Sequence, residues 1–119
     1  MPVYAAPSLA PAVERAIDVL GANAARVAVL AYVVEHPGCL VSEIAEGSGL
    51  AVGTVKTHVA TLAALGALSA EPAPSLPYSE RRGRRTRYTA RHDALAEHYR
   101  ELGRLLRLVG DDKPRGASS

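Results

Sequence analysis

The sequence predicts a mainly α-helical domain with one small β-hairpin. The chain has 119 residues, of which 48% are hydrophobic and 22% are charged, and this is the size and composition of one globular domain. Apolar residues recur at helical spacing along most of the chain, whereas a short segment at residues 86–89 alternates as a strand does. We therefore expect a flexible arm over residues 1–10, one domain over residues 11–109 and a disordered tail over residues 110–119.

Two helices are predicted at the start of this domain. Pro11 suits the first position of a helix over residues 11–20. The apolar stripe of this helix is Val13, Ala16, Ile17 and Leu20. Asn23 can cap a second helix, which His36-Pro37-Gly38 should end, because a residue before proline avoids helical backbone angles. The stripe predicted to face inward from the second helix is Val27, Leu30, Ala31 and Val34.

A helix-turn-helix motif is predicted next. A short helix over residues 41–46 leads into the turn Gly47-Ser48-Gly49 and a longer helix over residues 50–65. The motif needs a small residue where its helices cross and a glycine in the turn, and Ala45 and Gly49 supply these. The side chains of the longer helix that should face inward are Val52, Val55, Val59 and Leu62.

A hairpin rich in arginine follows the motif. Residues 67–71 and 86–89 are predicted as its strands, and a proline-rich stretch follows the first of them. Arginine side chains at the tip of a hairpin can enter the minor groove of DNA or follow its phosphates. The arginines predicted to do so are Arg81, Arg82, Arg84, Arg85 and Arg87.

The segment from Val55 to Leu68, together with the hairpin and Tyr88, resembles winged-helix regulators of the ArsR and MarR type. The likeness covers about residues 24–109. It implies a winged helix-turn-helix fold with N- and C-terminal dimerisation helices, a homodimer, and repression of transcription from a palindromic operator.

The longer helix of the motif is then the recognition helix. With its apolar stripe turned inward, Lys56 and Thr57 point outward, and Thr54 lies on the flank. Lysine can reach a phosphate or a guanine edge, and threonine can bond a phosphate or touch a thymine methyl group. We expect Thr54, Lys56 and Thr57 to contact double-stranded DNA in the major groove.

The distribution of charge supports a polyanionic partner. The whole chain has a net charge of only +2, but residues 1–79 carry −3 and residues 80–107 carry +5. Positive charge concentrated in the hairpin and the last helix favours DNA as the partner.

A final helix over residues 92–109 is predicted to make the homodimer together with the first helix. Its apolar residues are spaced 4, 3, 4 and 3 apart, as in a heptad seam. The predicted interface residues are Val13, Ile17, Leu20, Leu95, Tyr99, Leu102, Leu106 and Val109.

Other reactive residues are not expected to carry chemistry. The recognition-helix residue His58 should be packed or contact a phosphate, and the single cysteine, Cys39, should be buried, although a redox role stays open. His98 and Glu101 match half of the zinc pattern of some metal-sensing relatives, but the other half is absent. We predict no metal, no cofactor and no catalytic site, and the sequence leaves open whether an effector is bound.

The sequence therefore predicts a cytoplasmic, homodimeric, sequence-specific DNA-binding transcriptional regulator that acts as a repressor and is not an enzyme. No apolar run of about 18 residues and no basic leader is present, so we expect neither a membrane span nor a secretory signal. Two alternatives share the fold: an architectural DNA binder, such as an excision or partition factor, and a winged-helix module that binds an acidic protein.

Overall fold

A computed structural model describes residues 9–21, 23–73, 77, 79, 83 and 85–108. The arm predicted over residues 1–10 therefore lies mostly outside the described residues, and the tail over residues 110–119 lies wholly outside them. Three arginines of the hairpin and one residue of the predicted seam also lie outside: Arg81, Arg82, Arg84 and Val109.

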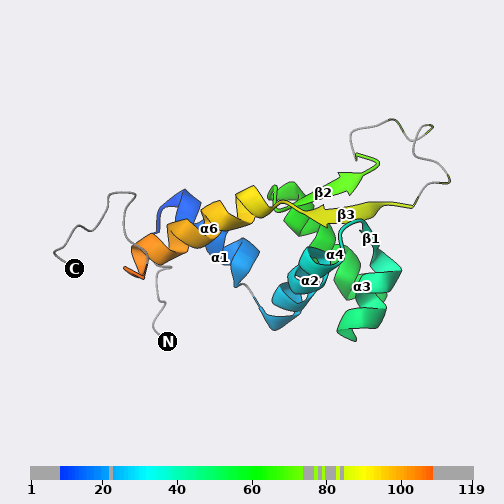
Figure 1. Cartoon of the computed structure of the whole chain (residues 1–119), viewed down its shortest axis with the longest axis horizontal. Coiled ribbons are helices and arrows are strands. Elements are labelled where there is room, and N and C mark those ends of the chain that lie inside the picture. Colours follow the sequence, from blue (N-terminus) through cyan, green and yellow to red (C-terminus); the bar gives the residue numbers. More distant parts are fainter. Residues whose placement is uncertain are drawn as a thin grey trace, which may run out of the picture.

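The described chain forms helices around a small antiparallel sheet whose strand order is β1-β3-β2. In Figure 1, α1 and α6 lie side by side at one end, while α2, α3, α4 and the sheet form the other end. The elements are α1 (Pro11–Leu20), α2 (Ala24–Glu35), β1 (Cys39–Leu40), α3 (Val41–Ser48), α4 (Val52–Ala64), β2 (Leu68–Glu71), β3 (Arg87–Ala90) and α6 (His92–Leu105). This is the mainly helical fold with a β-hairpin that the sequence predicts.

The sheet contains one strand that the sequence did not predict. Cys39 and Leu40, to which the sequence assigns neither helix nor strand, pair with Tyr88 and Arg87 as the edge strand β1. A two-residue strand shows no alternation, and its partner lies almost fifty residues away, so local pattern could not identify it. This pairing ties the start of the helix-turn-helix to the hairpin.

Local signals set several helix ends, although α3 extends to Ser48 where the prediction ended at residue 46, and α4 covers Val52–Ala64 where the prediction was 50–65. The side chain of Asn23 caps α2 by accepting a hydrogen bond of 2.8 Å from the backbone N–H of Arg26. The carboxylate of Glu43 accepts a hydrogen bond of 2.8 Å from the backbone N–H of Leu40, and so satisfies a donor ahead of α3. Gly49 ends α3 with a φ of 76°, a left-handed conformation that favours glycine.

The core lies between α2, α3, α4 and the sheet, and it corrects four predicted inward positions. Ile17, Val27, Ala31 and Val52 are exposed. In α1 the predicted Val13 and Ala16 are buried, and Val19 is buried in place of Ile17. In α2 the buried residues are Arg26, Val29, Leu30 and Val33, so the buried stripe lies one residue before the predicted one. The largest fully buried side chains are Ile44, Leu62, Val19, Val29, Val33, Val55 and Val59.

These corrections have local causes. The sequence of α2 is apolar on almost every face, so its periodicity does not identify the buried side. Val52 is the first residue of α4 and projects beyond the packed part of the helix. The final helix is also shorter than predicted: it ends at Leu105, before Arg107, which adopts a φ of 58°.

One close contact fixes how α2 and α3 pack. A Cβ atom added at Gly47 would lie 2.2 Å from Cε2 of Tyr32, whose ring stacks on His36 at a centroid distance of 4.0 Å. Any larger residue at this position therefore has to displace the ring.

We expect Gly47→Ala to lower the free energy of unfolding by about 1–3 kcal/mol, as overpacking does, when measured by urea denaturation. The matched control is Gly53→Ala, because a Cβ atom there meets nothing within 4 Å. This control should be neutral or stabilising by up to about 1 kcal/mol, since alanine is the better helix former. Equal stability of the two variants would contradict the packing described for Tyr32.

None of the described helices is by itself long and apolar enough to cross a bilayer, although α1 and α2 together, across a bend of 77°, have the length and composition to do so.

Candidate nucleic-acid interface

The exposed face of α4 carries the predicted recognition residues. Thr54, Lys56 and Thr57 are all exposed, whereas Val55 and Val59 are buried in the core. The hydroxyl of Thr57 donates a hydrogen bond of 3.1 Å to the carbonyl oxygen of Gly53. That hydroxyl can therefore still accept a hydrogen bond from a ligand, but it must rotate before it can donate one.

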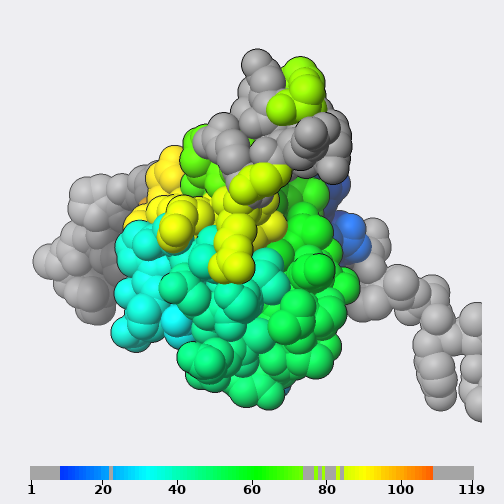
Figure 2. Space-filling model, turned by 90° about the vertical axis from the view of Figure 1, so that its right-hand side faces the viewer, coloured from blue at the N-terminus to red at the C-terminus, as the bar shows by residue number. Residues whose placement is uncertain are grey.

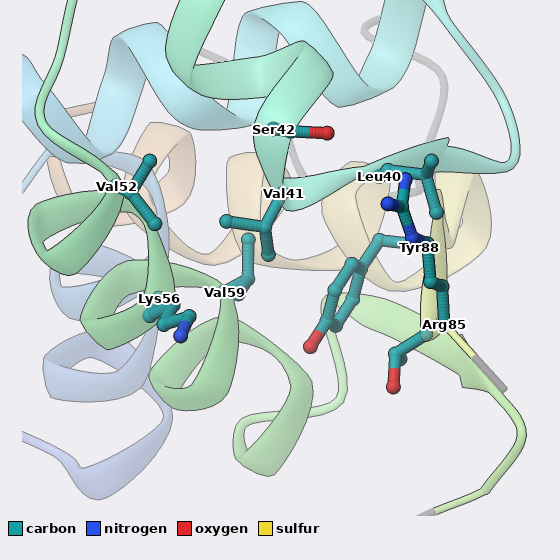
Figure 3. Close-up of a pocket in the computed structure, with 9 residues that line it drawn as sticks. Leu40, Val41, Ser42, Val52, Lys56, Val59, Arg85 and Tyr88 are labelled. Carbon is teal, nitrogen blue, oxygen red and sulfur yellow. The ribbon is translucent and has the colours of Figure 1, made fainter. Parts of the chain in front are cut away.

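A cavity of about 530 Å³ lies between this helix, the start of α3 and the hairpin (Figure 3). Its apolar lining comes largely from Leu40, Val41, Val52 and Val59. Lys56 approaches it from α4, and Arg85 from the residues that lead into β3. None of the described residues that line this cavity, or groove, is acidic. The positive charges of Lys56 and Arg85 are therefore not neutralised by a carboxylate of the lining.

The hairpin arginines that the structure describes differ in their surroundings. Arg85 lines the cavity, and its exposed side chain has no ion pair with any described residue. Arg87 is also exposed, but one guanidinium nitrogen donates a hydrogen bond of 3.0 Å to the carbonyl oxygen of Gly38. The structure therefore places Lys56 and Arg85 on the lining of one cavity, and it gives Arg87 a contact that braces the hairpin against the turn before β1. Figure 2 shows β3 and the adjoining helices from this side of the molecule.

His58 is packed inside the fold, which is one of the two roles predicted for it; the other was contact with a phosphate. It is 8% exposed on the inner side of α4, and its Nδ1 accepts a hydrogen bond of 3.2 Å from Nε of Arg26. Arg26 is itself 9% exposed, and its Nη1 donates to both the backbone oxygen and the carboxylate of Asp18, at 2.8 Å each. Sequence reasoning missed this buried cluster, because the only signal for it was an arginine inside an otherwise apolar helix.

Burial, together with the charge of Arg26, lowers the pKa of His58 below its usual value. The folded chain therefore holds His58 neutral at a pH where the unfolded chain, with an ordinary pKa near 6.5, binds a proton. This contribution to stability is present above about pH 6.5 and is lost as the pH falls towards the lowered pKa.

We therefore expect the free energy of unfolding to fall between pH 7.5 and pH 5.5 by more in the wild type than in His58→Asn. Asparagine can accept the Arg26 hydrogen bond but does not titrate. The difference between the two urea-denaturation series removes the contribution of carboxylates common to both chains. Parallel pH profiles would show that His58 is not held neutral by the fold.

Cys39 is buried, and its Sγ lies 3.8 Å from the carbonyl oxygen of Tyr88. Burial is the main cause that raises the pKa of its thiol. A raised pKa keeps the thiol protonated, and a protonated thiol is a poor nucleophile and metal ligand.

The paired helices α1 and α6 leave an apolar face uncovered. Tyr99 is 62% exposed and Leu106 is 56% exposed, and Ile17 is exposed on the neighbouring helix. The other described residues of the predicted interface behave differently: Val13 is buried within the chain, and Leu20, Leu95 and Leu102 are half-buried. The large hydrophobic residues that are exposed in the described part of this end are Ile17, Tyr99, Leu105, Leu106 and Leu108.

The acidic residues of α6 are engaged with arginines. Glu97 pairs with Arg100 at 2.9 Å, and Glu101 pairs with Arg104 at 2.8 Å. The hydrogen bond from Arg100 is the main cause that lowers the pKa of Glu97. Within the described residues, no group of three or more His, Cys, Asp or Glu side chains is arranged to hold a metal ion.

This geometry, with an exposed second helix after a glycine turn and a hairpin beside it, defines a winged helix-turn-helix protein. Residues 27–72 match the model of the IclR helix-turn-helix domain. A search of curated proteins found no significant match.

Solved structures share the same fold. The chain is similar to the PcaV transcriptional regulator from Streptomyces coelicolor, with 23% sequence identity, a TM-score of 0.52, and coverage of 82% of this chain and 68% of that one. It is also similar to the RV1404 protein from Mycobacterium tuberculosis, with 12% identity, a TM-score of 0.50, and coverage of 89% and 74% respectively. The predicted winged-helix class is thereby confirmed, whereas the specific likeness to ArsR-type regulators stays a prediction.

Proposed function

We propose that the protein is a homodimeric, sequence-specific DNA-binding regulator of transcription that acts as a repressor. The observation that carries this proposal is the exposed face of α4, where Lys56 shares an acid-free groove with Arg85 of the hairpin. In a winged helix-turn-helix, this helix is the element that enters the major groove.

The charges and shapes of this surface suit a DNA duplex. Gly53 and Ala60 are exposed on α4 and are small enough for the helix to approach the base edges closely. Lys56 would reach a phosphate or a guanine edge, and Arg85 would hold the neighbouring backbone. The other hairpin arginines predicted from the sequence, Arg81, Arg82 and Arg84, would add phosphate contacts. Because DNA is the proposed partner, we also propose that the protein acts in the cytoplasm.

The proposed dimer rests on the uncovered face of α1 and α6. Apolar side chains such as Tyr99 and Leu106 gain most by burial against a second copy, since a two-fold interface uses the same patch twice. Two recognition helices related by such an axis would contact two half-sites about one helical turn apart.

Repression is the mode we propose because a bound dimer blocks the DNA that it covers without needing any further contact. The two alternatives make different predictions for the DNA. An architectural factor would protect arrays of direct repeats, and a protein-interaction module would bind no DNA.

Fluorescence anisotropy on random duplex DNA at low salt, followed by selection of bound sites and footprinting, separates these functions. We expect binding that weakens steeply with salt, and a selected site with two-fold symmetry. Absence of binding at low salt would favour the protein-interaction module, and protection of direct repeats would favour the architectural factor.

A further inference from the structure

A buried arginine joins the two ends of the molecule. Arg26 lies in the first turn of α2, directly after the turn that separates α1 from the rest of the fold (Figure 1). Its guanidinium contacts Asp18 near the end of α1 through Nη1 and His58 in the middle of α4 through Nε. One side chain therefore spans three helices.

The surrounding contacts show why this link matters. Helix α1 packs chiefly on α6, and it meets the remainder of the fold mainly at its end, next to α2. Asp18 lies before the α1–α2 turn and Arg26 after it, so their two 2.8 Å contacts brace the turn. The hydrogen bond to His58 extends this brace to the helix that carries Lys56 and Thr57.

The hydrogen bonds of Arg26 restrict where Asp18 and His58 can lie. A buried guanidinium is costly unless its donors are satisfied, so Arg26 holds its partners in a fixed geometry. His58 can accept from Nε of Arg26 only while its Nδ1 carries no proton. A residue that served packing alone would be apolar, as the other buried residues of α2 are.

We propose that Arg26 is a positioning residue, which fixes the orientation of α4 relative to α1 and α6 and thereby sets the half-site spacing that the dimer accepts. This inference rests on the proposed function, because it assumes a dimer that contacts two half-sites. Arg26 itself touches no DNA; it acts through His58 and Asp18.

Half-site spacing is a readout that a loss of stability alone would not change. The probes are the duplex selected by the wild-type chain and versions of it with one base pair inserted or removed between the half-sites. One base pair rotates a half-site by about a tenth of a turn. We expect this change to weaken wild-type binding by about tenfold or more, a loss comparable to one mismatched base pair.

Arg26→Met removes the hydrogen bonds to Asp18 and His58, so the recognition helices can reorient to follow a changed spacing. We therefore expect this variant to reduce the spacing penalty to less than about threefold. All measurements are made well below the unfolding midpoint of each variant, with the folded state checked by circular dichroism. The matched control is Arg15→Met, since Arg15 is exposed on α1 and should leave the penalty unchanged.

A second pair of variants tests the same link from the other side, in case Arg26→Met does not fold. His58→Asn keeps an acceptor near the position of Nδ1 and should keep the wild-type spacing penalty. His58→Leu fills a similar volume without an acceptor and should lose the penalty as Arg26→Met does.

The outcomes distinguish this inference from the proposed function. A wild-type chain that binds no duplex would overturn both. A wild-type chain that binds without spacing selectivity would overturn the inference alone. The same follows if Arg26→Met or His58→Leu folds and retains the full wild-type penalty.

Discussion

Replacing Tyr99 by glutamate should convert the protein into a monomer and weaken its binding to a two-half-site duplex by about a hundredfold or more. Tyr99 is 62% exposed in the single chain, so the charge is solvated there and the fold is preserved. In a two-fold interface the same change buries two unpaired carboxylates, at a cost of several kcal/mol. Loss of the second half-site then removes the gain in affinity that comes from joining two binding modules.

Light scattering coupled to size exclusion measures the mass of the variant, and anisotropy measures its affinity. Leu106→Lys is a second variant with the same expectation, because lysine at the end of α6 is compatible with the helix dipole. Val27→Asp is the matched control, since Val27 is exposed on α2 and not on α1 or α6. A dimer of unchanged affinity in both interface variants would rule out this face as the interface.

The second large effect is expected at the groove between α4 and the hairpin. Lys56→Ala should weaken binding to the selected duplex by about 1–3 kcal/mol and change the base preferred at one position of each half-site, because Lys56 lies on α4, the proposed recognition helix. Arg85→Ala should weaken binding to all sequences alike, and it should flatten the dependence of log affinity on log salt by about two, one for each copy in the dimer.

Competition binding with selected and random duplexes, repeated over a series of salt concentrations, measures both effects. Arg15→Ala is the control for loss of one positive charge, because its side chain is exposed on α1, away from the groove. If Lys56→Ala and Arg85→Ala both bind as the wild type does, the groove is not the DNA contact.

Much of the fold could be predicted because short-range signals encode it. Asn23 caps a helix through its own side chain, and Gly49 ends one through a backbone angle that glycine adopts easily. The outward positions of Lys56 and Thr57 followed from the spacing of Val55 and Val59, which the structure confirms as buried.

The remaining features depend on contacts between segments far apart in the sequence. The strand at Cys39 needs Tyr88 as its partner, and burial of Arg26 needs both Asp18 and His58. Neither pattern is visible within one helix or strand. The predicted inward stripe of α2 is wrong by one residue, because a helix that is apolar on almost every side shows no preferred side until its neighbours are known.

The predicted interface on α1 and α6 combined residues with two different roles. Val13 serves the packing within one chain, whereas Tyr99 and Leu106 remain uncovered. Periodicity identifies an apolar stripe but does not say whether the same chain or a second copy covers it.

The central claim is that two chains bind one duplex through paired recognition helices. Its most direct test is the mass of the complex with the selected duplex in solution, combined with a footprint of both strands. We predict two chains per duplex and two protected half-sites related by a two-fold axis. A complex of one chain per duplex, or no complex at low salt, would contradict the account.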